Sequence, residues 1–174
     1  PEGPFPVDAA LVQISPPGPE GRHSLGTNVG STIDIVHTAP LVIAQVNPQV
    51  PYTFGAGELP CDAFDYLVDI ETALNEAKVS PPDRIASAIA DYAAGEILDE
   101  STLQFGVGSI PEAVLMALKE HKDLGVHGGM ISSATASLLE AGVITNRAKT
   151  FDQDAIVAGE VLGERDVFDW VHRN

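Results

Sequence analysis

The chain has 174 residues, and 44% of them are hydrophobic, which is enough to bury a core and excludes general disorder. Nine Lys and Arg stand against 25 Asp and Glu, giving a net charge of −16. A surface this acidic repels phosphate backbones, which argues against nucleic-acid and anionic-membrane binding. The length suggests one domain or parts of two.

The single cysteine, Cys61, cannot form an internal disulfide, and this favours a reducing cytoplasm. No apolar run approaches the ~18 residues of a membrane helix, and no basic-then-apolar leader is found. The sequence therefore predicts a cytoplasmic protein without membrane association. It begins with Pro1 rather than Met, so we expect the numbering to start inside a longer polypeptide.

Short apolar runs alternate with helical patterns in the first part of the chain, which favours an α/β fold with a mainly parallel sheet. Buried strands are predicted at 7–14 and 41–46, a weak helix at 32–39, and a short element at 64–68. Three prolines and two glycines predict a shaped loop at 15–21, because they can neither continue a strand nor start a helix.

After a connection with few apolar residues, Ser80 is predicted to cap a helix that runs to about residue 97. Its apolar face is predicted from helical spacing to comprise Ile85, Ala88, Ile89, Tyr92 and Ala93. Strands are then predicted at 102–107, 124–127 and 155–162, and helices at 110–121, 133–141 and 165–172. The expected order after Ser80 is α-β-α-β-α-β-α.

A glycine loop at residues 106–110 (Gly-Val-Gly-Ser-Ile) carries the clearest signal for chemistry. It joins a predicted strand to a predicted helix, with Ser109 placed to cap the helix and Pro111 in the first turn. Free amides beside glycines that allow close approach suit a phosphate, a carboxylate or a polarised carbonyl. An NAD-type site is disfavoured because it needs a third glycine where the chain has Pro111. A tight turn without a ligand is the alternative interpretation.

Several motifs in one order resemble the acetyl-CoA hydrolase/transferase family, which includes 4-hydroxybutyrate CoA-transferases. They are SPPGPEGRHSLG at 15–26, VIAQVNPQVPYTFG at 42–55, TLQFGVGSIPEAVL at 102–115 and VHGGMISSATASLLEAGVITNRAKT at 126–150. Family members are considerably longer at both ends. The resemblance implies parts of two CoA-transferase-like lobes with mainly parallel sheets flanked by helices. Residues 1–72 would end the first lobe, 73–80 would connect, and 81–174 would begin the second.

The resemblance also implies acyl-CoA chemistry, either CoA transfer between carboxylic acids or acyl-CoA hydrolysis, in a cytoplasmic metabolic protein. Coenzyme A or acyl-CoA would be a substrate rather than a permanently bound cofactor, a small carboxylate would be the other partner, and no metal is expected. A homo- or hetero-oligomer, or the remainder of a longer chain, would complete the protein. The residues expected to border coenzyme A are Gly106, Val107, Gly108, Ser109, Ile110, Gly128, Gly129, Met130 and, from the other lobe, Asn47 and Gly55.

The reacting group of the family is missing from this sequence. The family pattern is approximately His-Thr/Ser-Glu-Met-x-Ser-Asp-Gly, and its glutamate attacks the thioester. Here the residues at 127–134 are His-Gly-Gly-Met-Ile-Ser-Ser-Ala, so Gly129 occupies the glutamate position. Glycine has no side chain to attack a thioester, and the family's covalent relay cannot run through it.

The catalytic residue is therefore unknown from sequence. His127 is a weak candidate for a general base acting on water, against the alternative that it packs locally. Ser132 and Ser133 are better explained as helix caps. Candidate cations for coenzyme A are Lys119, Lys122, Arg147 and Lys149. Three interpretations remain: an acyl-CoA enzyme with altered chemistry, a CoA-binding subunit without turnover, and a structural partner in a heteromer.

Overall fold

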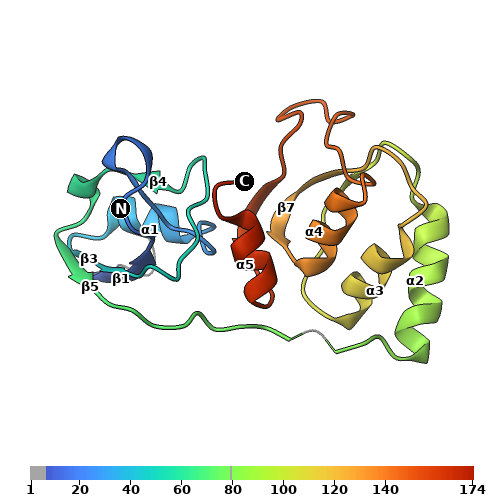
Figure 1. Ribbon diagram of the computed structural model, residues 1–174, viewed down its shortest axis with the longest axis horizontal. Coiled ribbons are helices and arrows are strands. Elements are labelled where there is room, and N and C mark those ends of the chain that lie inside the picture. Colours follow the sequence, from blue (N-terminus) through green and yellow to red (C-terminus); the bar gives the residue numbers. More distant parts are fainter. Residues whose placement is uncertain (1–6, 79) are drawn as a thin grey trace. The chain divides into compact units, whose positions relative to one another are not determined.

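The computed structural model describes residues 7–78 and 80–174, which form two compact units (Figure 1). The first contains the described residues up to 75 together with 168–174, and the second contains the described part of 76–167. Both combine parallel strands with helices, so the predicted α/β class is confirmed. Residues 1–6 of the predicted first lobe and residue 79 of the predicted connection lie outside the described residues. Within the described chain, none of the helices has the length and apolarity of a membrane span.

The first unit is built on a parallel sheet in the order β1 (Ala10–Ile14), β3 (Val42–Val46), β5 (Tyr66–Asp69). One face of the sheet packs into a core that includes side chains of helix α1 (Thr32–Thr38). Side chains alternate between the two faces along a strand, and every second side chain of β1 and β3 therefore points into this core. The predicted strands and helix of this unit are confirmed, with the short element at 64–68 forming β5.

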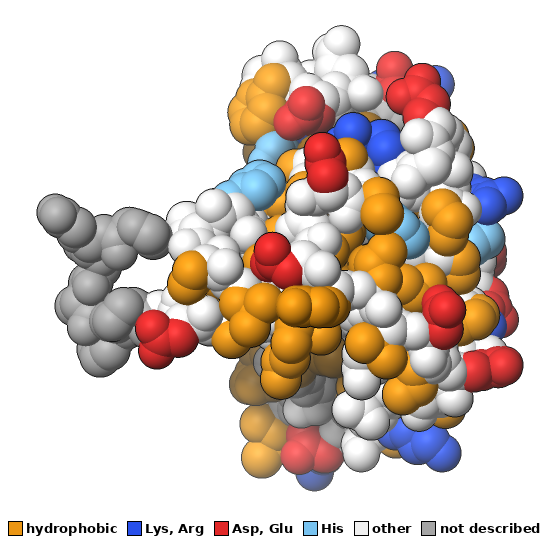
Figure 2. Space-filling view, turned by 90° about the vertical axis from the view of Figure 1, so that its left-hand side faces the viewer, with side chains coloured by type: hydrophobic (Ala, Val, Ile, Leu, Met, Phe, Trp, Pro, Cys, Tyr) orange, Lys and Arg blue, Asp and Glu red, His pale blue; other side chains and the backbone are white. Residues whose placement is uncertain are grey.

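The opposite face of this sheet is uncovered within the described residues and carries both apolar side chains and the amides of Gln13 and Gln45, which hydrogen-bond to each other at 3.4 Å. Leu11, Ile43 and Tyr66 are in register across the three strands, and Leu11 is 79% and Tyr66 62% exposed. Figure 2 looks at the first unit and shows hydrophobic side chains gathered on its surface. Parallel sheets normally have both faces covered, so this face is an unpartnered surface that is only partly apolar.

Several short elements were not predicted. Strand β2 (His23–Ser24) pairs antiparallel with β4 (Glu58–Leu59), and one-turn 3-10 helices occur at η1 (Pro19–Gly21) and η2 (Cys61–Ala63). The predicted loop at 15–21 thus ends in a tight turn whose middle residue, Glu20, has a left-handed backbone (φ 57°) and so departs from helical geometry.

A buried tyrosine joins two segments of the first unit. Tyr52 is 1% exposed, and its hydroxyl donates to Glu58 Oε1 at 2.7 Å. Burial, with the bond to Glu58, raises the pKa of Tyr52 to about 12, and the same bond lowers the pKa of Glu58. Because the pKa of the folded phenol lies above its ordinary value of 10.0, its contribution to stability is present below that pH and is lost as the pH rises toward 12.

Replacing Tyr52 by phenylalanine is expected to lower the free energy of unfolding by about 1–2 kcal/mol at neutral pH. The variant should also lose less stability than the wild type between pH 10 and 12. Urea unfolding at several pH values measures both effects. An unchanged alkaline decline in the variant would show that Tyr52 does not titrate as described.

The second unit contains a parallel sheet in the order β6 (Thr102–Leu103), β7 (Gly125–Ile131), β8 (Val157–Val161). Its helices are α2 (Arg84–Glu96), α3 (Ser109–Ala117) and α4 (Ser133–Glu140), and α5 (Arg165–Val171) follows β8. The predicted order α-β-α-β-α-β-α is confirmed.

Two predictions for α2 are wrong. The cap is Asp83 rather than Ser80, because the Asp83 carboxylate accepts a hydrogen bond from the Ala86 amide at 2.7 Å. The predicted apolar face is exposed: Ile85, Ile89 and Tyr92 are all accessible. The alanines at 86, 90 and 94 are buried instead, and the first two pack with Ala113 of α3, because small side chains let the two helices approach closely.

The end of α5 groups with the first unit, whereas the sequence assigns 81–174 to the second lobe. Two bonds account for this grouping: the amide of Arg173 donates to the carbonyl of Tyr52 at 2.8 Å, and the amide of Tyr52 donates to His172 Nδ1 at 3.0 Å. The predicted connection carries neither helix nor strand over residues 73–78. The assignment of the two units to CoA-transferase lobes stays a prediction.

Candidate functional site

The loop before α3 begins earlier than predicted, and its residues 106–110 are all exposed. Strand β6 ends at Leu103, so residues 104 and 105 belong to the loop. Gly108 is the N-cap of α3, with φ of 136°, and Ser109 is the first helical residue, so the prediction that Ser109 caps the helix is wrong. Only glycine adopts this φ readily, and the backbone can therefore turn into α3 one residue sooner. Val107 is 69% exposed, which leaves the loop open to solvent.

Strand β7 extends beyond its predicted end at His127, because its pairing with β8 continues to Ile131. Residues 127–130 therefore lie within the strand and not in a loop after it. Alternation along the strand places His127 and Gly129 on one face and Gly128 and Met130 on the other. Gly129 is exposed, whereas Met130 is buried.

Position 129 has room for a side chain. A Cβ atom built on Gly129 would meet no atom within 4 Å, whereas one on Gly128 would lie 3.0 Å from Gln104 Cγ. The carboxyl ends of parallel strands share one edge of a sheet, so the glycine loop after β6 and Gly129 near the end of β7 lie at the same edge. This edge is where open α/β sheets bind ligands.

His127 lies beside two residues of the segment before β8. Its Nδ1 lies 4.0 Å from Oδ2 of Asp152, and its ring meets Phe151 edge-on with centroids 4.9 Å apart. The imidazole is 32% exposed. Sequence reasoning did not find Asp152, because it is 25 positions away in an irregular segment without a motif.

The candidate cations have other partners or lie on the surface. Lys149 is 3% exposed and donates from Nζ to the carbonyls of Val126 at 3.2 Å and Ala155 at 2.8 Å. Burial lowers the pKa of Lys149, opposed by the charge of Asp152. Arg147 pairs with Asp123 at 2.8 Å. Lys119 and Lys122 are exposed.

The two candidate residues of the first unit differ in accessibility. Asn47 is fully buried, and its amide donates to the Thr72 carbonyl at 2.9 Å and accepts from the Gln49 amide at 3.1 Å. It ties the end of β3 to the segment after β5. Gly55 is exposed at φ of 104°, and its amide donates to Glu58 at 2.9 Å. Roles for either residue in binding coenzyme A stay predictions.

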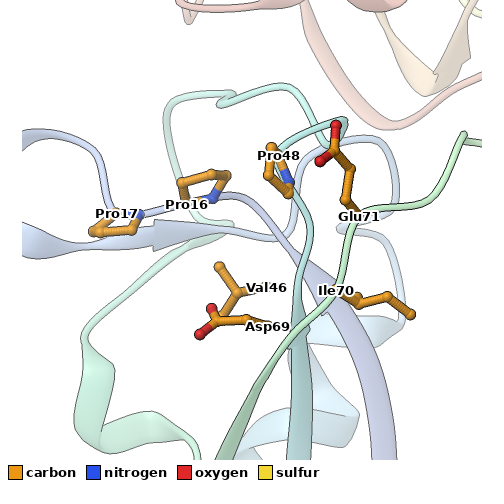
Figure 3. Close-up of a pocket in the computed structure, with 7 residues that line it drawn as sticks. All are labelled: Pro16, Pro17, Val46, Pro48, Asp69, Ile70 and Glu71. Carbon is orange, nitrogen blue, oxygen red and sulfur yellow. The ribbon is translucent and has the colours of Figure 1, made fainter.

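A shallow pocket lies at the carboxyl ends of β1, β3 and β5 (Figure 3). Its lining residues are Pro16, Pro17, Val46, Pro48, Asp69, Ile70 and Glu71. The lining offers two carboxylates and no cation, which is a poor match for an anionic phosphate. Among the described residues, no group of His, Cys, Asp and Glu side chains could hold a metal ion.

Known CoA-transferases match the chain over nearly its whole length, although no protein-family model matches it. It is 38% identical over 170 residues to the 4-hydroxybutyrate coenzyme A transferase of Clostridium kluyveri, covering 98% of this chain and 40% of that protein. It is 34% identical to the succinyl-CoA:acetate/propanoyl-CoA:succinate CoA transferase of Fasciola hepatica, and the match covers 97% of this chain and 35% of that protein. The crystal structure of 4-hydroxybutyrate CoA-transferase from Porphyromonas gingivalis superposes with a TM-score of 0.94 at 34% identity, covering 99% of this chain and 44% of that one.

The parallel sheets and these matches show the fold of part of a CoA-transferase. The chain is a partial member of the CoA-transferase family and is similar to its 4-hydroxybutyrate CoA-transferases. It spans about two fifths of the length of the curated relatives that it matches, at 40% and 35% of the two named above. The predicted resemblance is thereby confirmed.

Proposed function

We propose that the chain acts on acyl-CoA thioesters and holds their thioester end at the glycine loop. The observation that carries this proposal is the 38% identity over 170 residues to a 4-hydroxybutyrate coenzyme A transferase. The exposed loop at the carboxyl edge of the second sheet supports it. An acyl-CoA and a small carboxylate would be the substrates, with coenzyme A released or exchanged rather than retained.

The loop offers backbone hydrogen-bond donors of the kind that a thioester oxygen requires. The first amides of α3 have no acceptor within the helix, and they carry the positive end of its dipole. Hydrogen bonds from such amides to the thioester oxygen would stabilise the negative charge that develops when the carbonyl carbon is attacked. Gly106 has no atom within 4 Å of a built Cβ, so substrate can approach the backbone there.

A second candidate function is favoured by Gly129. A chain without the family's glutamate could bind coenzyme A, or complete an oligomer, without turnover of its own. Thiol release from acyl-CoA distinguishes the candidates. Release without an added carboxylate indicates hydrolysis, acceptor-dependent exchange indicates transfer, and saturable binding without release indicates a binding subunit.

Replacing Gly108 by alanine is expected to weaken coenzyme A binding about tenfold or more, because alanine does not adopt φ of 136° without displacing the loop. Titration calorimetry with coenzyme A measures the affinity. Gly142→Ala is the matched control, since Gly142 also has positive φ (74°) and ends α4 away from the loop. Absence of coenzyme A binding by the wild type, or equal affinity in Gly108→Ala, would overturn the proposal.

A further inference from the structure

The face of β7 that lacks the family's glutamate carries a histidine two positions earlier. His127 and Gly129 lie two positions apart, about 6.6 Å along β7, and are on the same side of the sheet. A Cβ at Gly129 would meet no atom within 4 Å, so the space in front of that face is open. A water molecule or an acyl group can therefore reach the histidine where the glutamate side chain would stand.

The imidazole of His127 lies between an aromatic ring and a carboxylate of the segment before β8. Phe151 contacts the ring edge-on, and the carboxylate of Asp152 is the acidic group beside Nδ1, at 4.0 Å. Nδ1 is buried and has no hydrogen-bond partner in the described part of the chain. A carboxylate next to Nδ1 favours the tautomer that carries its proton there, which leaves the lone pair of a neutral ring on Nε2. The ammonium group of Lys149 also interacts electrostatically with the carboxylate of Asp152.

Two serines follow this face of β7. Ser132, at the N-cap of α4, is 1% exposed, and its hydroxyl is buried away from solvent without a hydrogen-bond partner among the described residues. The hydroxyl of Ser133 donates to Asp166 at 3.4 Å. Residues 128–134 contain no acid and no cysteine. A reaction at this face thus needs a nucleophile from solution.

We infer that His127 is a general base that activates water against the acyl-CoA thioester, and that Asp152 is its positioning residue. The inference rests on the proposed function and makes the chain a thioester hydrolase. Nε2 of His127 removes a proton from water as the oxygen–carbon bond to the thioester carbonyl forms. The carbon–sulfur bond then breaks, and the imidazolium returns the proton to the departing thiolate. The products are a carboxylate and coenzyme A.

The test uses the whole chain and follows thiol release from butyryl-CoA without an acceptor carboxylate, with coenzyme A affinity measured in parallel. His127→Gln should lower kcat about 100-fold or more. Asp152→Asn should lower kcat about tenfold with little change in KM. Imidazole in solution should restore part of the activity of His127→Ala, which a structural role would not allow. Asp154→Asn is the matched control, because Asp152 and Asp154 both have positive φ (50° and 61°), which asparagine tolerates.

The outcomes separate this inference from the proposed function. A wild-type chain that binds coenzyme A and releases no thiol overturns the histidine mechanism and leaves acyl-CoA binding in place. Equal rates in the wild type and His127→Gln overturn it as well. A chain that does not bind coenzyme A removes the proposed function and the inference together. Slow release that depends on His127 and Asp152 but not on Asp154 supports the inference.

Discussion

Replacing Gly129 by glutamate is expected to create a covalent acyl-enzyme that the natural chain cannot form. The position is exposed, its φ lies outside the left-handed region, and no atom lies within 4 Å of a Cβ placed there, so a side chain can start from this position without a clash at Cβ. If the thioester binds at the glycine loop as proposed, a carboxylate there would attack it and release coenzyme A. Acceptor-dependent CoA exchange should rise at least about 100-fold, because a bound nucleophile reacts at high effective concentration.

Mass spectrometry and hydroxylamine trapping detect the acyl-glutamyl intermediate. Gly129→Gln is the control of matched size without a nucleophile, and Gly128→Glu places a carboxylate on the opposite face, against Gln104. Neither control should form an adduct. If all three variants behave alike, position 129 does not correspond to the family's glutamate.

Replacing Lys149 by alanine is expected to cost about 3–5 kcal/mol of folding free energy. The side chain fills buried space against Gly125, and its ammonium satisfies the carbonyls of Val126 and Ala155. Truncation removes the packed stem and leaves both carbonyls without their donor. Lys149→Met retains most of the stem and should cost about 1–3 kcal/mol, which isolates the lost hydrogen bonds.

Urea unfolding measures these losses. Arg147→Ala is the comparison, since an exposed pair such as Arg147–Asp123 contributes about 0–1 kcal/mol. A loss of coenzyme A affinity in Lys149→Met without a loss of stability would contradict the structural role and restore this lysine as a ligand for the coenzyme.

Strong periodic signals made most of the fold predictable. The alternation of strands and helices after Ser80 follows from apolar spacing and from turn residues, and both are local. The predicted end of one strand and the predicted buried face of one helix were wrong, because the side chains there carry little information. Gly128 and Gly129 gave no alternation to extend β7, and the alanine face of α2 was masked by the larger residues Ile85 and Tyr92, which are exposed in the described structure.

The candidate site was predictable from sequence only where glycines or a family sequence pattern occur. Glycines beside a helix start mark the loop at 106–110, and the family pattern predicts that Gly129 stands at the position of the family's glutamate, which stays a prediction. The partnership of His127 with Asp152 depends on a loop that returns to β7 before β8, which no spacing rule supplies. Burial of Lys149 is equally invisible in sequence, because a lysine there is normally expected on the surface.

Amide exchange and amide chemical shifts during titration with coenzyme A test the central claim most directly. If the glycine loop holds the thioester end, the amides of residues 106–110 should shift and become protected at saturating coenzyme A. The residues lining the pocket at the ends of β1, β3 and β5 should change little. Protection confined to that pocket, or no saturable change at 106–110, would contradict the account.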